Sequence, residues 1–155
     1  MKLFIPVGIP GSGKSFWLRA KGAVIVSPDA WRVFVYGGYP KELKKEREKE
    51  VWDLSYQQLS LCIDDGRDVG FDACSITADR RQDIMRYSAP GYKIIGVYFP
   101  TPVDVCIERQ KGRRNPISMN IIKDMQARLE EPMEDEGFNL IMQINYEDQQ
   151  HIHTV

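Results

Sequence analysis

The sequence contains few of the residues that build metal centres or disulfide frameworks. Its only two histidines are His151 and His153, and its three cysteines, Cys62, Cys74 and Cys106, form an odd and widely spaced set without a CxxC pair. This pattern favours neither a zinc site nor a disulfide framework. Because the histidines lie close to the last residue, we expect them in a frayed tail and not among ligands.

Long hydrophobic runs and a large charge excess of one sign are also missing. The first apolar run, residues 3–7, reaches a loop of proline and glycine after a few residues, which is too short for the core of a signal peptide or for a membrane span. We therefore expect a cytoplasmic protein that makes no membrane contact. The formal net charge is −1 and the isoelectric point is about 6.1. Any nucleic-acid partner must then be held by local basic patches, because no overall positive field attracts it.

The composition and the order of predicted elements favour one domain over residues 1–155. Hydrophobic residues make up 43% of the 155 positions and charged residues 28%, which is typical of soluble globular domains. The residue pattern predicts strands at 2–7, 23–26, 67–71, 92–99 and 138–145 and helices at 14–21, 28–36, 41–65, 78–87, 102–111 and 117–131. Strands that alternate with helices, without internal repeats, predict an α/β three-layer fold of the P-loop NTPase and kinase type, with a parallel sheet and helices on both faces.

Two of the predicted helices begin with distinctive residues. Ser27 and Pro28 predict a helix start, with Ser27 as the N-cap and Pro28 as the first helical residue. The helix at 41–65 begins with the charged run KELKKEREKE at residues 41–50. We interpret this run as a solvated helix face with Glu/Lys pairs four residues apart, and the alternative is a patch that faces a substrate or nucleic acid.

A nucleotide-binding loop follows the first predicted strand. Residues 8–15 read GIPGSGKS, which matches the P-loop spacing Gly-x-x-x-x-Gly-Lys-Ser between a strand and a helix. Glycines let the backbone N–H groups point at phosphate oxygens, and the helix that follows adds its positive dipole end. We expect Lys14 to reach the β- and γ-phosphates and Ser15 to offer its hydroxyl to Mg²⁺. The residues expected to bind ATP, or GTP or another nucleoside triphosphate, are Gly8, Pro10, Gly11, Ser12, Gly13, Lys14, Ser15 and Phe16.

Polar residues after the second and third predicted strands are candidates for an acceptor site. Asp29 and Asp72 follow these strands, and the carboxyl ends of neighbouring strands converge on the loop in this architecture. Asp29 is a candidate general base, with a helix-capping carboxylate as the alternative. Arg32, one helical turn later, could clamp an anionic acceptor or be a surface arginine. Asp72 resembles the acid that ends a Walker B strand, bearing on Mg²⁺ or on the acceptor, and the alternative is a turn aspartate.

Basic residues crowd the segment between the predicted helices at 102–111 and 117–131. They are Arg109, Lys111, Arg113 and Arg114. Cations there could neutralise a triphosphate, so we predict a short basic lid at about residues 109–118, with a solvated basic loop as the alternative. On a continuing helix Arg109 and Arg113 would share a face and Arg114 would point elsewhere.

These residues together resemble the P-loop 5′-hydroxyl polynucleotide kinases of bacteriophages and related small kinases, over nearly the whole chain. The resemblance rests on GIPGSGKS with Trp17, Asp29-x-x-Arg32, Asp72 with Arg80 and Arg81, Cys106-x-x-Arg109, the basic lid, Pro116-Ile117, Met125 and the EGFN at 136–139. It implies transfer of the ATP γ-phosphate to a hydroxyl. In that reaction Lys14 would hold the phosphates, Asp29 would be the base, Arg32 would clamp the acceptor phosphate, and Arg109 and Arg113 would contact the donor.

The chain departs from these enzymes at the third strand. They carry Asp-Thr-Asn there, whereas this chain has Asp72-Ala73-Cys74, and their separate phosphatase domain with its DxDGT motif has no counterpart in this sequence. The leading hypothesis is a kinase for the 5′-hydroxyl end of a polynucleotide. A kinase for a nucleoside, nucleotide, modified base or small metabolite is the second, and the acidic isoelectric point and the Ala73-Cys74 change favour it. A non-catalytic ATP-binding regulatory module is the third.

Overall fold

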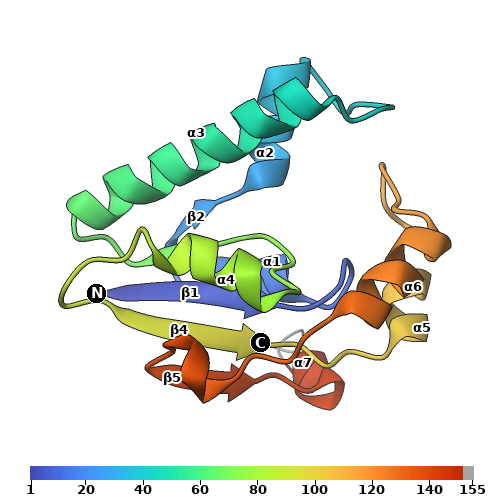
Figure 1. The fold of residues 1–155 in the computed structure, drawn as a ribbon. Coiled ribbons are helices and arrows are strands. Elements are labelled where there is room, and N and C mark those ends of the chain that lie inside the picture. Colours follow the sequence, from blue (N-terminus) through green and yellow to red (C-terminus); the bar gives the residue numbers. More distant parts are fainter. Residues whose placement is uncertain (152–155) are drawn as a thin grey trace.

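Five parallel strands form one sheet in the computed structural model, which describes residues 1–151 (Figure 1). The strands are β1 (Lys2–Val7), β2 (Val24–Val26), β3 (Val69–Phe71), β4 (Lys93–Tyr98) and β5 (Leu140–Gln143), and their spatial order is β2-β3-β1-β4-β5. Every neighbouring pair is parallel. The helices are α1 (Lys14–Arg19), α2 (Pro28–Tyr36), α3 (Lys45–Asp64), α4 (Ala78–Met85), α5 (Val103–Glu108), α6 (Met119–Arg128) and α7 (Tyr146–His151), and a 3₁₀ turn covers Glu134–Glu136. The predicted α/β P-loop kinase fold is confirmed.

The central strand β1 is buried on both faces because its side chains alternate between two helical layers. Leu3 and Ile5 pack with residues of α3 and α4 on one face of the sheet. Phe4 packs with Trp17 and Leu18 of α1 on the other. Parallel strands covered by helices on both faces read as short continuous apolar runs, which is why the strands were recognisable in the sequence. Full burial of each large apolar side chain contributes about 1.5–3 kcal/mol to folding.

A third apolar cluster lies beyond the sheet and supports the loop after β1. Ile9 of that loop packs with Cys106 of α5 and Ile122 of α6, and all three are buried. Figure 1 shows α5 and α6 together beyond the end of β4. The predicted phosphate loop therefore rests on a helical pair that is separate from both sheet-covering layers.

Several predicted helices begin later or end earlier in the structure. The helix predicted from residue 41 begins at Lys45, and residues 39–44 form an irregular segment before it. The Lys44 N–H donates a hydrogen bond to the Tyr36 hydroxyl at 2.9 Å, which holds this segment against α2. The helix predicted from residue 117 begins at Met119, after Ser118 caps it by accepting a hydrogen bond from the Ile121 N–H. The helix predicted to end at about Lys111 ends at Glu108.

The C-terminal segment contains a helix that the sequence pattern did not reveal. Residues 146–151 form α7, which corrects the frayed tail that the sequence predicts around His151. His151 closes α7, and His153 lies outside the described residues. The segment YEDQQH is short, polar and without a proline or glycine boundary, so its helical form depends on packing. Within residues 1–151 no helix combines the length and the hydrophobicity that a membrane crossing requires.

Candidate active site

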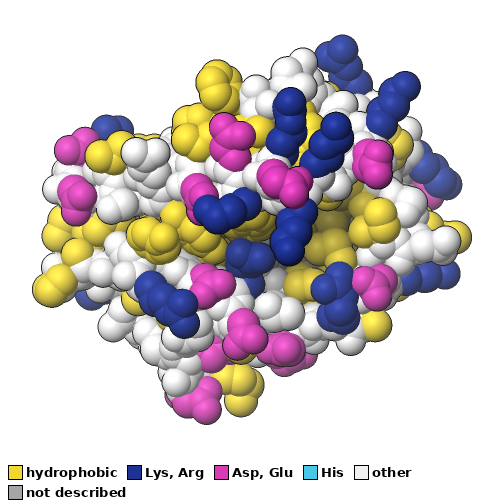
Figure 2. Space-filling model, turned by 45° about the horizontal axis from the view of Figure 1, so that its top comes forward, with side chains coloured by type: hydrophobic (Ala, Val, Ile, Leu, Met, Phe, Trp, Pro, Cys, Tyr) yellow, Lys and Arg dark blue, Asp and Glu magenta, His cyan; other side chains and the backbone are white. Residues whose placement is uncertain are grey.

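A cavity of about 850 Å³ opens at the carboxyl ends of β1, β2 and β3. Its walls come from the loop after β1, the start of α2, the loop before α3, the residues after β3 and the loop between α5 and α6. Figure 2 shows one face of the molecule, on which lysine and arginine side chains gather around a hollow. The sequence-predicted residues that line the cavity are Pro10, Gly11, Gly13, Lys14, Ser15, Phe16, Asp29, Arg32, Asp72, Arg109 and Arg113. The other two, Gly8 and Ser12, are buried residues of the phosphate loop that do not line the cavity.

Three glycines of the loop are required by the space around them. Gly11 and Gly13 have φ angles of 89° and 105°, in the left-handed region that favours glycine. A Cβ at Gly11 would lie 2.8 Å from the Cys106 carbonyl oxygen, and a Cβ at Gly8 would lie 2.6 Å from the Ser12 hydroxyl. The loop thus keeps a tight curl that suits phosphate oxygens, as the spacing of glycines predicted.

Lys14 lies folded over this loop. Its side chain is nearly buried, and its ammonium donates to the Ile9 carbonyl oxygen at 2.8 Å and to the Ser12 hydroxyl at 3.3 Å. The contacts hold a positive charge beside the loop's backbone amides. A triphosphate fits this arrangement, because its negative charge would meet the ammonium and the amides together.

Ser15 and Asp72 meet across the cavity floor. The Ser15 hydroxyl donates to Asp72 Oδ1 at 2.9 Å, and the Asp72 N–H donates to the Val26 carbonyl oxygen at 2.8 Å, which holds the aspartate at the end of β3. Among the side chains of residues 1–149, no three from histidine, cysteine, aspartate or glutamate lie close enough to hold one metal ion. A hydroxyl beside a carboxylate instead suits Mg²⁺, which binds through few protein ligands together with waters and phosphates.

Asp29 and Arg32 lie side by side on the first turns of α2. Ser27 caps the helix by accepting a hydrogen bond from the Ala30 N–H, so the cap is Ser27 as predicted, and Asp29 does not serve as that cap. The Asp29 carboxylate is 84% exposed, faces the cavity and forms an ion pair with Arg32. The exposed carboxylate is available to a substrate hydroxyl, and its neighbour keeps it in place.

Arg32 has a second partner that the sequence analysis placed elsewhere. Glu48 of α3 accepts from Arg32 Nε at 2.9 Å and from Arg32 Nη2 at 2.8 Å. The charged run at residues 41–50 predicts a solvated helix face, and the structure corrects this prediction for Glu48, whose side chain is 20% exposed. The nearby Lys49 pairs four residues on with Asp53, an exposed aspartate that lies beyond the charged run of residues 41–50.

The Arg32–Glu48 pair shifts the pKa of both groups. The hydrogen bond from Arg32 holds the pKa of Glu48 below its ordinary value of 4.5, although partial burial opposes the shift. The hydrogen bond to Glu48 raises the pKa of Arg32. Both groups are therefore charged at neutral pH, and Arg32 is held by two carboxylates, one on its own helix and one on α3.

The basic segment at 109–118 connects α5 to α6 and borders the cavity. Arg109 Nη1 donates to the Gly11 carbonyl oxygen at 2.8 Å, so this arginine holds the backbone of the phosphate loop through a hydrogen bond. Because α5 ends at Glu108, the helical spacing that would separate Arg114 from Arg113 does not apply, and both line the cavity. Whether the segment closes over a nucleotide as a lid stays a prediction.

Gln149 of α7 is a site residue that the sequence analysis missed. Its side chain is nearly buried, and its amide donates to the Thr101 hydroxyl at 3.0 Å while its carbonyl accepts from Arg109 Nη1 at 3.1 Å. A Cβ at Gly13 would lie 2.8 Å from Gln149 Oε1. The glutamine therefore fills the space behind the phosphate loop, and no local pattern around position 149 indicates this role.

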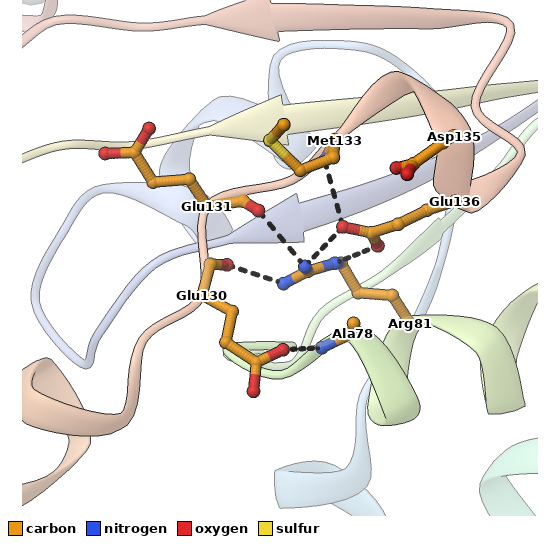
Figure 3. A pocket seen from close by; sticks show the side chains of 7 residues that line it. All are labelled: Ala78, Arg81, Glu130, Glu131, Met133, Asp135 and Glu136. Atoms are coloured by element: carbon orange, nitrogen blue, oxygen red, sulfur yellow. Dashed lines mark hydrogen bonds and ion pairs between the residues drawn. The ribbon is translucent and has the colours of Figure 1, made fainter.

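Arg81, part of the resemblance described above, lies outside this site. Figure 3 shows its guanidinium beside a separate cavity of about 380 Å³. It is fully buried, and Glu136 accepts from its Nε and Nη2, each at 2.6 Å. Its remaining donors reach the carbonyl oxygens of Ser75, Glu130 and Glu131. These contacts tie the segment after α6 to α4, so the role of Arg81 is structural.

Solved structures with a similar fold include several kinases. A sugar kinase from Janibacter sp. HTCC2649 is 18% identical with a TM-score of 0.69, over 99% of this chain and 91% of that one. The APS kinase CysC of Mycobacterium tuberculosis, in complex with AMPPNP and APS, is 20% identical with a TM-score of 0.60, over 98% and 94%. A chain of the Pnkp1/Rnl/Hen1 RNA repair complex is 23% identical with a TM-score of 0.73, over 83% of this chain and 43% of that one.

Identities at this level show a shared fold and no shared substrate. Curated proteins give no match to this sequence. A family model, described as an AAA domain, matches residues 3–132, which is well over half of the chain and includes the phosphate loop, Asp29, Asp72 and the basic segment. The chain therefore belongs to the AAA domain family and has the α/β fold of P-loop kinases.

Proposed function

We propose that this protein is a kinase that transfers the γ-phosphate of ATP to a hydroxyl, with the 5′-hydroxyl end of a polynucleotide as the acceptor. The observation that carries the proposal is that Lys14, Ser15, Asp29 and Asp72 line one cavity from three different segments. A regulatory module that only senses ATP would need the phosphate loop but no exposed carboxylate facing it.

The proposed reaction assigns one task to each side chain. The acceptor hydroxyl attacks the γ-phosphorus, the bond between that phosphorus and the β–γ bridging oxygen breaks, and the hydroxyl proton passes to Asp29. Lys14 and Arg113 face the growing negative charge of the phosphates. Ser15 and Asp72 would hold Mg²⁺, which neutralises phosphate charge when bound.

An anionic acceptor is supported by Arg32. Two carboxylates already accept from its guanidinium, yet a guanidinium has five N–H groups, and the three N–H groups that Asp29 and Glu48 engage leave two for a ligand. A phosphate one nucleotide away from the reacting hydroxyl would match such a donor. The resemblance to polynucleotide kinases and the fold shared with the RNA repair complex favour a polynucleotide end.

A small hydroxyl acceptor is the second candidate. Ala73 and Cys74 line the cavity at the position where the phage enzymes have threonine and asparagine, so the wall there lacks two polar side chains. The sugar kinase and the APS kinase with similar folds show that this architecture is also found with small acceptors.

A panel of acceptors tests the proposal. The protein is incubated with γ-labelled ATP, Mg²⁺ and, separately, 5′-hydroxyl DNA and RNA oligonucleotides, nucleosides, mononucleotides and sugars. We expect label on the oligonucleotide ends. Label on small acceptors alone overturns the polynucleotide assignment and supports the second candidate, whereas bound ATP without any labelled acceptor supports the regulatory module.

Replacing Glu48 by glutamine is expected to weaken acceptor use selectively. The change removes the negative charge that holds Arg32 while keeping the side chain's shape, so we expect kcat/KM for the acceptor to fall about threefold to tenfold, with KM for ATP unchanged. The matched control is Glu50→Gln, an exposed glutamate on the same helix. An equal loss for ATP and acceptor, or an equal loss in the control, contradicts this positioning role.

A further inference from the structure

The loop before α3 carries an exposed aromatic ring at the mouth of the cavity. Tyr39 lines the cavity together with Pro40, yet its side chain is 61% exposed. An aromatic face that is open to solvent at the rim of a nucleotide-sized hollow can stack on a base, because every nucleobase presents a flat π-face. The proposed reaction gives this ring no task.

Three lysines follow Tyr39 in the same segment. Lys41, Lys44 and Lys45 are exposed, and none of their side chains forms an ion pair with a side chain of residues 1–149. Residues 37–47 hold four basic and two acidic side chains, a net charge of +2, although the whole chain carries −1. The segment is thus a local basic patch of the kind that a polynucleotide partner of an acidic protein requires.

The position of this segment is set by its contacts with α2. The Tyr36 hydroxyl binds the Lys44 backbone at both its N–H (2.9 Å) and its carbonyl oxygen (3.3 Å). Arg47, the fourth basic residue, is engaged here too: it lies over the Tyr36 ring and donates to the Val35 carbonyl oxygen at 2.8 Å. These contacts place the lysines beside the helix that carries Asp29.

The opposite rim of the cavity is also basic. Arg113 and Arg114 line the cavity from the loop between α5 and α6. Figure 1 shows this loop and the loop before α3 projecting on the same side of the molecule, beyond the carboxyl ends of the strands. Figure 2 shows the lysine and arginine side chains around the hollow. A strand whose end enters the cavity would therefore pass basic side chains as it leaves.

We infer that Tyr39, Lys41, Lys44 and Lys45 form a rim surface that binds the single-stranded part of the acceptor just after its 5′-terminal nucleotide. Tyr39 stacks on a base, and the lysines pair with backbone phosphates. The inference rests on the proposed function and extends it, because it makes the length of the acceptor, and not its terminal nucleotide alone, a determinant of affinity. A small acceptor would leave this surface unused.

The test compares a long and a short acceptor in binding and in kinetics. The long acceptor is a 5′-hydroxyl oligonucleotide of about twelve nucleotides with a dye at its 3′ end, and the short one is a nucleoside 3′-monophosphate, which has no nucleotide after its first. We expect Tyr39→Ala to raise the Kd for the oligonucleotide, from fluorescence anisotropy, about tenfold. For the triple change Lys41→Ser, Lys44→Ser and Lys45→Ser, the slope of log Kobs against log salt should fall in magnitude by about 2. For the nucleoside 3′-monophosphate, kcat/KM should stay nearly constant in both rim variants.

The matched control is Phe34→Ala. Phe34 is an aromatic residue of α2, five positions before Tyr39, and it is 74% exposed but does not line the cavity. A loss of affinity as large in Phe34→Ala as in Tyr39→Ala overturns the rim surface, as does an equal loss for both acceptor lengths or unchanged binding in both rim variants. If the wild-type protein phosphorylates no oligonucleotide, the proposed function fails, and the anisotropy series still decides separately whether the rim surface binds single strands.

Discussion

Replacing Asp29 by asparagine is expected to lower kcat for phosphoryl transfer about 100- to 10,000-fold while leaving ATP affinity unchanged. Asparagine keeps the size of the side chain but cannot take the proton of the attacking hydroxyl, and a positioned general base contributes rate factors in that range. ATP affinity is retained because the phosphate loop and Lys14 lie on other segments of the cavity. The measurement is kcat with the best acceptor of the panel, together with calorimetric ATP binding.

Asp79→Asn is the matched control for this change. Asp79 lies in the first turn of α4, which Thr77 caps in the same way as Ser27 caps α2. Both substitutions remove a carboxylate from a helix N-terminus, which costs about 0.3–1 kcal/mol of stability through the helix dipole. Only Asp29→Asn should lose activity. If Asp29→Asn keeps its kcat, or if kcat falls equally in both variants, then Asp29 only stabilises the helix and is not the general base.

Replacing Arg81 by methionine is expected to destabilise the protein by about 3–5 kcal/mol. The change removes one partner of a buried ion pair, so the Glu136 carboxylate loses its charged partner and three backbone carbonyls lose the N–H groups of Arg81. Urea unfolding followed by circular dichroism measures the loss. In the double variant Arg81→Met with Glu136→Gln, the loss should be smaller than the sum of the two single losses, because no unpaired buried charge remains.

Arg86→Met provides the comparison on the same helix. Arg86 pairs with Asp83, but both side chains are largely exposed, so its loss should change stability by less than about 1 kcal/mol. Similar losses for Arg81→Met and Arg86→Met would contradict the structural role of Arg81. A large loss of stability in Arg81→Met with unchanged kcat under folding conditions would support it, since Arg81 does not line the active-site cavity.

In the Arg81→Met variant, the free energy of unfolding should depend less on acid pH than in the wild type. Partial burial raises the pKa of Glu136, but the hydrogen bonds from Arg81 and from the Met133 N–H outweigh it, so the pKa lies below its ordinary value of 4.5. A lowered folded-state pKa means that this carboxylate stabilises the fold above about pH 4.5 and that the stabilisation disappears as the pH falls through the lowered pKa. As the pH falls from neutral through this lowered pKa, the free energy of unfolding should therefore decrease less in Arg81→Met than in the wild type.

The donor half of the candidate site could be predicted from the sequence because its signals are local. The glycine spacing, Lys14 and Ser15 lie within eight consecutive residues, and the backbone conformation that they need is set by glycine φ angles within the loop. The cap at Ser27 and the strand that ends before Asp72 are likewise defined by a few adjacent positions. These local features predict the same structure in any tertiary arrangement in which a strand, a loop and a helix follow one another.

The remaining parts of the site join residues that are distant in the chain. Arg32 meets Glu48 across 16 positions, Gln149 meets Arg109 across 40, and Arg81 meets Glu136 across 55. The periodicity of the sequence does not predict such pairs. A charged residue on a polar helix gives the same sequence pattern whether its side chain faces water or a partner. They depend on how α2 packs on α3, how α7 packs behind the phosphate loop, and how the 3₁₀ turn Glu134–Glu136 packs on α4.

The sequence by itself therefore determined that a triphosphate-binding loop lies at the end of a parallel strand, with carboxylates after two neighbouring strands. The tertiary structure decided how those groups are held. It turned one glutamate of a charged helix into the partner of Arg32, placed Tyr39 at the cavity, and buried Arg81 in an ion pair with Glu136 away from the candidate site. The physical reason is that backbone preferences act over a few residues, whereas ion pairs and cavity walls depend on which elements pack together.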